Sequence, residues 1–328
     1  MEDRSELKTS AKAYFLLQRS VLLSILLILI TYHLRLTAEV GAHFLKIGIG
    51  ARSMGLGGAY VGLSDDITSL YWNPAGLRKL KTKEFGFMHT KWVLDTKYEF
   101  AGIGIPLNNK TIGLGIMYLD LGEIEGRSEE GIETGSFRAS DFCFTISGAK
   151  RISNRIDLGA TIKFIQQKIE KEEAKGVAVD IGVKCKVKGV KGDLGLVIKN
   201  IGPEMKFIDE PYNLPLTISL GGGYNFLGNF VISLDINHEI YDDKTSISMG
   251  IEYRPVRFIS LRAGYLYKLA YQLLTYQNSL FQEENKIFDF NGLSGGFGLN
   301  FSNYILDYSL IPYKDLGLTH RLSFKIKF

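Results

Sequence analysis

From about residue 84 to the end of the chain, apolar and polar side chains alternate with a period of two residues. On an extended chain this pattern places the two sets on opposite faces of a sheet. The final residues show it most clearly. Their apolar set is Leu318, Leu322, Phe324, Ile326 and Phe328, and their polar set is Thr319, Arg321, Ser323, Lys325 and Lys327. No segment of comparable length has the period of an amphipathic helix, so we predict an all-β protein.

Turn signals divide this region into about fourteen strands, mostly eight to twelve residues long. Strands of soluble sandwiches are usually nearer five or six residues, whereas a tilted strand that crosses a bilayer needs about nine to eleven. Transmembrane barrels of bacterial outer membranes have an even number of strands, with the apolar set facing lipid. Residues 84–328 are therefore predicted to form a transmembrane antiparallel β-barrel.

The N-terminal residues have the composition of an export signal. Residues 21–30 are a ten-residue, almost wholly apolar run preceded by Lys8, Lys12 and Arg19. This run is about half the length that a membrane-spanning helix needs. We predict a signal peptide over residues 1–42, cleaved after Ala38 or Ala42, and the outer membrane of a diderm bacterium as the destination. An uncleaved anchor is the alternative.

Composition excludes several classes of function. The net charge of +4 comes from 39 basic and 35 acidic residues interleaved along the chain, so no basic tract suits nucleic acid. The two cysteines, Cys143 and Cys185, are too few for a disulfide framework and lack the spacing of zinc ligands. We expect no metal and no cofactor.

Between the signal and the first strand, residues 43–83 are rich in glycine. Glycine at this density disfavours a long helix and permits close packing of the backbone. Ser64, Asp65 and Asp66 could cap a short helix over residues 67–71, which Asn73 and Pro74 would end. The chain contains no Gly-Lys dipeptide, which argues against a phosphate-binding loop. We predict a compact element that plugs the barrel.

One segment has the spacing of a hydrolase motif. Residues 292–296 fit the pattern G-x-S-x-G, and Asp307 or Asp315 and then His320 follow Ser294 in the order of a catalytic triad. A nucleophile elbow requires a strand, a sharp turn and a helix, but Ser294 lies in an alternating strand pattern. We expect no catalytic residues and no enzyme.

Three groups of motifs carry a resemblance to a known family. The first comprises residues 50–59, Asp65-Asp66 and Tyr71-Trp-Asn-Pro-Ala-Gly76. The second comprises residues 199–203 and 214–216, and the third residues 292–299, 306–308 and 315–322. Together they resemble the PorV/PorQ family of outer-membrane proteins, which belongs to the FadL-like group. The resemblance implies a fourteen-stranded barrel with the N-terminal segment folded inside as a hatch.

The resemblance and the alternation also name candidate site residues. The plug motif is Gly55, Gly57, Gly58, Asp65, Asp66, Trp72, Asn73, Pro74 and Ala75. The terminal strand, read by the barrel-insertion machinery through its aromatic end, contributes Leu322, Phe324, Ile326 and Phe328. Charged residues expected to face the lumen, where they hold the plug or are merely solvated, are Asp157, Lys163, Asp235, Glu252, Arg262, Asp307, Arg321 and Lys325.

Residues 269–290 form the longest predicted loop and are unusually apolar for an exposed segment. The candidate docking residues in it are Tyr271, Leu273, Leu274, Tyr276, Leu280 and Phe281. The resemblance implies a docking or shuttle role in type IX secretion of proteins to the cell surface, with exported proteins and outer-membrane lipid as partners.

Two alternatives remain. A FadL-like channel would carry long-chain fatty acids or other hydrophobic compounds. It would have an apolar pocket beside the plug, to which Met54, Leu56, Tyr60 and Tyr71 could contribute. A purely structural outer-membrane protein would have neither cargo nor ligand.

Overall fold

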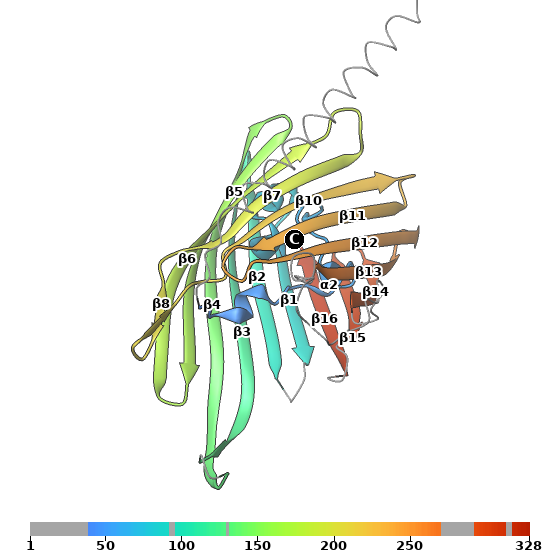
Figure 1. Ribbon diagram of the computed structural model, residues 1–328. Coiled ribbons are helices and arrows are strands. Elements are labelled where there is room, and N and C mark those ends of the chain that lie inside the picture. Colours follow the sequence, from blue (N-terminus) through green and yellow to red (C-terminus); the bar gives the residue numbers. More distant parts are fainter. Residues whose placement is uncertain (1–38, 92–95, 129–130, 270–291, 313–316) are drawn as a thin grey trace, which may run out of the picture. The chain divides into compact units, whose positions relative to one another are not determined.

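The computed structural model describes residues 39–91, 96–128, 131–269, 292–312 and 317–328 (Figure 1). Residues 1–38, which make up most of the predicted signal peptide, lie outside the described residues. So does the predicted docking loop, with Tyr271, Leu273, Leu274, Tyr276, Leu280 and Phe281. Among the described residues, no helix is both long enough and apolar enough to cross a membrane.

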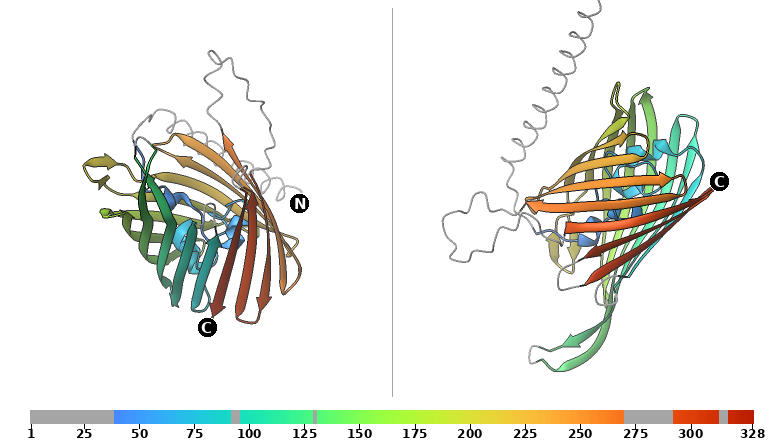
Figure 2. Two further views of the ribbon diagram at one scale, coloured as in Figure 1. Left: turned by 90° about the horizontal axis from the view of Figure 1, so that it is seen from below. Right: turned by 90° about the vertical axis from the view of Figure 1, so that its right-hand side faces the viewer.

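The described residues form a closed antiparallel barrel of fourteen strands (Figures 1 and 2). The strands are β1 (Glu84–Lys91), β2 (Lys97–Leu107), β3 (Lys110–Arg127), β4 (Glu133–Ser153), β5 (Ile156–Ile169), β6 (Glu172–Lys186), β7 (Gly192–Ile201), β10 (Thr217–Phe226), β11 (Phe230–Glu239), β12 (Lys244–Val256), β13 (Ile259–Leu269), β14 (Leu293–Phe301), β15 (Tyr304–Pro312) and β16 (Leu318–Lys327). Pairing of β1 with β16 closes the barrel. The predicted antiparallel β-barrel of about fourteen strands is confirmed.

Side chains alternate across the barrel wall as the sequence predicts. In β16, Arg321 is 1% exposed and faces inward, whereas its neighbour Leu322 is 47% exposed and faces outward. All eight charged residues predicted to face the lumen are buried. Apolar side chains therefore cover the outer surface of the barrel, and polar ones line much of its interior.

The predicted strand lengths are too short for one part of the wall. β3 has 18 residues and β4 has 21, against the expected eight to twelve. β4 pairs with β5 only as far as Ala139, so residues 123–127 and 133–138 continue as a two-stranded ribbon. Figure 1 shows this green hairpin standing away from the rest of the barrel. Alternation alone does not reveal where a strand leaves the wall.

The two ends of the barrel differ. At one end, here named the short-turn end, turns of two to five residues join β2–β3, β4–β5, β6–β7, β10–β11, β12–β13 and β14–β15. The opposite loop end carries the longest connections, including residues 202–216 with the hairpin of β8 (Met205–Phe207) and β9 (Glu210–Tyr212). The chain ends at the short-turn end, where the Phe328 amide donates to the carbonyl of Lys83.

Residues 39–83, here named the inner segment, lie inside the barrel (Figure 2). Their short helices are η1 (His43–Lys46), α2 (Ala51–Met54), α3 (Ser69–Trp72) and η2 (Pro74–Lys79). The segment starts at the loop end, where Val40 forms a bridge with Asn213, and reaches the short-turn end before β1. Cleavage after Ala38 would retain this bridge, whereas cleavage after Ala42 would remove it.

The helix predicted over residues 67–71 is wrong in its start and its cap. Helix α3 begins at Ser69, and Thr68 at its N-cap makes no side-chain capping bond. Asp66 accepts hydrogen bonds from the amide and hydroxyl of Thr68 instead, which forms a turn before the helix. The predicted end is confirmed, because Asn73 is extended and Pro74 starts η2.

Candidate functional site

Asn73 joins the inner segment to the barrel wall. Its side chain is fully buried, and Oδ1 accepts from the amide of Ala75 at 3.1 Å. Nδ2 donates to the carbonyl of Val61 at 3.3 Å and to that of Val183, in β6, at 3.1 Å. The extended backbone before Pro74 sets this orientation. One amide side chain therefore holds two parts of the inner segment against one strand.

Replacing Asn73 with alanine should lower the free energy of unfolding by about 1–3 kcal/mol, because two buried carbonyls lose a donor. Urea unfolding in detergent micelles, followed by tryptophan fluorescence, measures the change. Asn109→Ala, in an exposed turn, is the matched control and should stay within about 0.5 kcal/mol of wild type. An equal loss in both variants would contradict the role of Asn73.

A buried carboxylate lies at the centre of an ion-pair cluster near the short-turn end. Glu252, in β12, accepts from Nε of Arg52 at 2.9 Å, of Arg254 at 3.0 Å and of Arg262 at 2.7 Å. Arg52 belongs to the inner segment, whereas Arg254 and Arg262 belong to β12 and β13. Three guanidinium groups thus surround one side chain that has no exposed surface.

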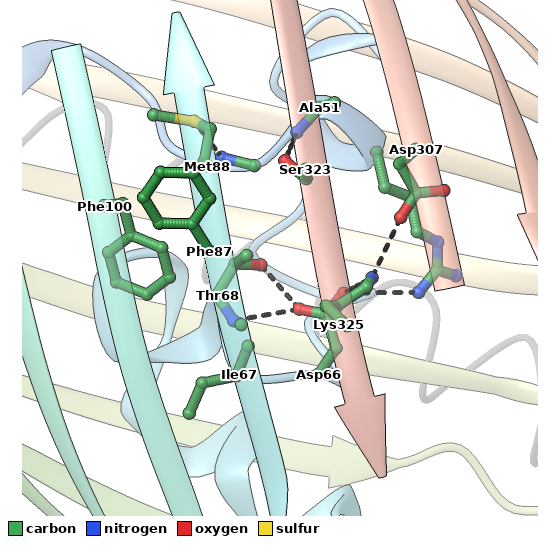
Figure 3. Close-up of a pocket in the computed structure, with 13 residues that line it drawn as sticks. Ala51, Asp66, Ile67, Thr68, Phe87, Met88, Phe100, Asp307, Ser323 and Lys325 are labelled. Carbon is green, nitrogen blue, oxygen red and sulfur yellow. Dashed lines mark hydrogen bonds and ion pairs between the residues drawn. The ribbon is translucent and has the colours of Figure 1, made fainter. Parts of the chain in front are cut away.

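Further ion pairs extend this cluster to the nearby strands β15 and β16 (Figure 3). Lys325 lies 2.7 Å from Asp66 of the inner segment and 3.1 Å from Asp307 of β15, and Arg262 lies 2.8 Å from Asp307. Burial opposes ionisation of Asp66, yet Lys325 and Arg52 hold the pKa of its carboxyl well below the usual range. The cluster therefore binds the inner segment to β12, β13, β15 and β16.

Other buried cations of the wall hold the backbone of the inner segment. Lys184 donates to the carbonyl of Ser64, and Arg321 donates to that of Gly48. At the loop end, Lys46 lies 2.7 Å from Asp242 and 3.0 Å from Glu239. Burial opposes protonation of Lys46, but hydrogen bonds to these two carboxylates raise its pKa. The inner segment is thus anchored at both ends of the barrel.

Inward-facing glycines let the inner segment approach the wall closely. A methyl group on Gly264 would overlap the backbone of Leu56 and Gly57, and one on Gly182 would overlap the side chain of Asn73. A methyl group would also meet inner-segment atoms at Gly86, Gly102, Gly104, Gly113, Gly115, Gly159, Gly195, Gly221, Gly223 and Gly250. The sequence signal that identifies them is a glycine at the inward position of an alternating strand, which our sequence analysis missed.

The lumen has an apolar side and a polar side. Inward-facing residues of β1–β5 include a buried apolar group, here named the apolar sector: Met88, Tyr98, Phe100, Met117, Leu119, Cys143 and Ile165. It belongs to the same hydrophobic cluster as Phe44, Leu70 and Tyr71 of the inner segment. Inward-facing residues of β12–β16 are mostly serine, threonine or charged. The apolar sector breaks the expected rule that polar residues line the lumen.

Two cavities lie beside the inner segment. One, of about 420 Å³, opens among the ion pairs at the short-turn end, and Ile305 is its only apolar lining residue. The other, in Figure 3, has about 10 Å³ and is lined in part by Ile67, Met88 and Phe100. Neither is lined by Met54, Leu56, Tyr60 or Tyr71, the residues predicted to form an apolar pocket. Leu56, Tyr60 and Tyr71 are buried instead.

The residues of the plug motif lie together in the inner segment. Gly57 has φ 67° and its amide donates to Oγ of Ser294 at 3.0 Å; Gly58 has φ 79°. Trp72 Nε1 donates to the carbonyl of Ile49 at 2.9 Å. Gly55, Asp65, Asp66, Asn73, Pro74 and Ala75 belong to the same segment.

The hydrolase-like residues do not meet. Ser294 faces inward from β14, whereas His320 faces outward from β16 and is 2.7 Å from the hydroxyl of Tyr308. Asp315 lies outside the described residues. The terminal-strand residues Leu322, Phe324 and Ile326 face outward, and Phe328 is 65% exposed at the short-turn end.

The chain belongs to the Uncharacterised protein family UPF0164, whose profile matches residues 34–292. Comparison with curated protein sequences gave no match. Membership of the PorV/PorQ family, which the motifs resemble, is not shown and stays a prediction.

Solved structures share the fold. The CymD monoaromatic hydrocarbon channel aligns with a TM-score of 0.64 at 14% identity, over 86% of this chain and 98% of that one. The P. putida toluene transporter TodX gives 0.63 at 14%, over 86% and 99%. A Pseudomonas aeruginosa FadL homologue gives 0.58 at 10%, over 89% and 100%. At these identities the likeness shows a FadL-like barrel fold alone.

Proposed function

We propose that this protein is an outer-membrane channel for hydrophobic small molecules and that its inner segment is a movable plug. The observation that carries the proposal is the apolar sector of β1–β5, which faces the inner segment, whereas the inward-facing residues of β12–β16 are mostly polar. Burial of apolar surface is the main source of affinity for an apolar ligand. The structural neighbours named for hydrocarbon and toluene transport support this substrate class.

The outer surface supports a membrane location. Outward-facing Ile112, Ile162, Leu234 and Ile251 are 47–50% exposed, as expected of side chains that contact lipid. In outer-membrane barrels the short turns face the periplasm and the longer loops face outward. A ligand entering from the loop end would contact the apolar sector first and would displace Leu70 and Tyr71 of the plug. The ion-pair cluster holds the far end of the plug and sets the resistance to this movement.

A disulfide that locks the plug tests the proposal. The amide of Ala51 is 2.8 Å from Oγ of Ser323 in β16, so cysteines at these two positions lie close together. In a Cys143→Ala/Cys185→Ala background, oxidised Ala51→Cys/Ser323→Cys should lose uptake of toluene and of a long-chain fatty acid. Intact diderm cells without their own channel for these compounds provide the assay, with radiolabelled compound measured inside the cells.

Reduction of the disulfide is the first control and should restore uptake. The single variant Ser323→Cys in the same background controls for the substitution itself. Equal uptake by the oxidised and reduced double variant would contradict a movable plug. Absence of uptake by the unlocked protein, despite a folded barrel in the outer membrane, would contradict the channel itself.

The secretion role implied by the PorV/PorQ resemblance has no support in the comparisons, and its docking loop lies outside the described residues. Affinity purification from the native outer membrane in mild detergent separates the three candidate roles. Bound hydrophobic molecules support the channel, whereas stoichiometric exported proteins would favour docking. A pure barrel with neither would favour a structural protein.

A further inference from the structure

The fold gathers positive charge at the short-turn end. We define the short-turn rim as residues 81–84, 107–111, 150–157, 186–193, 226–230, 254–259, 301–304 and 326–328. Its exposed cations are Lys81, Lys83, Lys110, Lys150, Arg155, Lys186, Lys188, Lys191, Arg257 and Lys327. Every residue of the rim is described, and none of its aspartate or glutamate side chains is exposed. Glu84 and Asp157 are buried, and half-buried Asp193 is paired with Lys79 at 2.6 Å.

The described residues of the loop end have no such bias. Its exposed residues include Glu123, Glu125 and Glu133 on the long ribbon, together with Lys168 and Lys171 beside the β5–β6 turn. The net charge of the whole chain is only +4. The short-turn rim is therefore positive because of the topology, which brings the cations of separate turns to one end.

Two lysines of the rim lie side by side on the outer face. Lys110 and Lys150 are directly opposed in the pairing of β3 with β4, and both are exposed. Like charges in this arrangement destabilise a sheet. Neither lysine forms an ion pair with a described residue. An anion held between them would remove the repulsion.

Apolar side chains are exposed at the same level. Leu227 at the tip of the β10–β11 turn is 76% exposed, Val190 and Phe258 are each 49% exposed, and terminal Phe328 is 65% exposed. Lysine and arginine beside exposed apolar side chains suit the boundary of a bilayer, where the cations reach phosphate and the apolar groups reach acyl chains.

We infer that the short-turn rim binds the phosphate headgroups of anionic phospholipids in the leaflet that surrounds it. The cations occupy four of the six short turns as well as the chain before β1 and the end of β16. A leaflet that encircles the barrel matches this distribution, whereas an acidic protein would need one continuous patch. The inference rests on the proposed function only in placing the barrel in a membrane.

The test compares two triple variants of the full chain that remove the same charge from opposite ends. Lys186→Gln/Lys188→Gln/Lys191→Gln alters the β6–β7 turn of the rim. Lys168→Gln/Lys171→Gln/Lys175→Gln, on exposed residues beside the β5–β6 turn, is the control. Each protein is reconstituted in mixed phosphatidylcholine–phosphatidylglycerol vesicles, and native mass spectrometry counts the lipids of each class that remain bound.

We expect wild type to retain phosphatidylglycerol in preference to phosphatidylcholine. The rim variant should lose this preference by about tenfold, since each cation near an anionic surface contributes several-fold, while the control variant keeps it. Added salt should weaken the preference of wild type. Equal retention of the two lipids by wild type, or an equal loss in both variants, would overturn the inference. Failure of the wild-type chain to fold in these vesicles would overturn the membrane location as well, and this outcome separates the two proposals.

Discussion

The substitution Gly264→Ala is expected to displace the plug and raise the permeability of the barrel. A methyl group at this position of β13 would overlap the backbone of Leu56 and Gly57, which cannot yield as a flexible side chain can. Gly57 cannot easily adjust, because it has φ 67° and its amide is bonded to Ser294. Overpacking of this kind costs about 1–3 kcal/mol. The wall is a closed hydrogen-bonded ring, so we expect the inner segment to move instead.

Two measurements on purified protein check this expectation. Single-channel conductance in planar bilayers should rise, and the free energy of unfolding in micelles should fall by the amount given above. Gly148→Ala is the matched control, since Gly148 lies in strand β4 and a methyl group there would contact nothing within 4 Å. Unchanged conductance and stability in Gly264→Ala would show that the inner segment does not pack against this strand.

The sequence predicts the barrel because one physical rule governs every strand. A wall one layer thick with lipid outside must alternate, and Arg321 beside Leu322 is as clear in the sequence as in the structure. The rule does not hold where a strand leaves the wall or where its inner face does not meet water. β3 and β4 continue to pair beyond the wall, and the apolar sector of β1–β5 faces a segment of the chain instead of water.

The sequence predicts which residues belong to the candidate site but not which of them contact one another. Glu252, Arg262, Asp307 and Lys325 follow from alternation as inward-facing charges, yet nothing in the sequence pairs them. Each contact joins residues far apart along the chain, such as Lys325 with Asp66. The glycines that let the inner segment approach the wall lie at inward positions. The sequence does not show which part of the inner segment each of them contacts.

The charge of the short-turn rim shows the same limit. Along the chain its lysines and arginines are interleaved with carboxylates, so the sequence predicts no concentrated basic tract. The carboxylates near the turns, Glu84 and Asp157, are inward-facing and buried, whereas the neighbouring cations are outward. Alternation thus places these carboxylates inside the wall and the neighbouring cations outside it. The order of strands and turns then brings the cations to the short-turn end.

The second large effect is expected for Glu252→Ala. This carboxylate is the common partner of Arg52, Arg254 and Arg262, and two of these guanidinium groups are themselves almost fully buried. Removing one partner of a buried ion pair costs about 3–5 kcal/mol, and here the buried guanidinium of Arg262 would keep only Asp307 as a carboxylate partner. We expect a loss of this size in the free energy of unfolding in micelles. Arg52 would also lose its partner in the wall. The plug should then open without a ligand, and uptake through the barrel should no longer require the ligand to release it.

Glu252→Gln separates the charge from the shape, since the amide keeps one acceptor oxygen and nearly the same volume. The free energy of unfolding of Glu252→Gln should be higher than that of Glu252→Ala but well below that of wild type. Glu173→Gln is the matched control: Glu173 forms an exposed pair with Lys175 at 2.9 Å, and removing such a pair should cost less than about 1 kcal/mol. Wild-type stability in Glu252→Gln would mean that hydrogen bonding, and not charge, holds the three arginines.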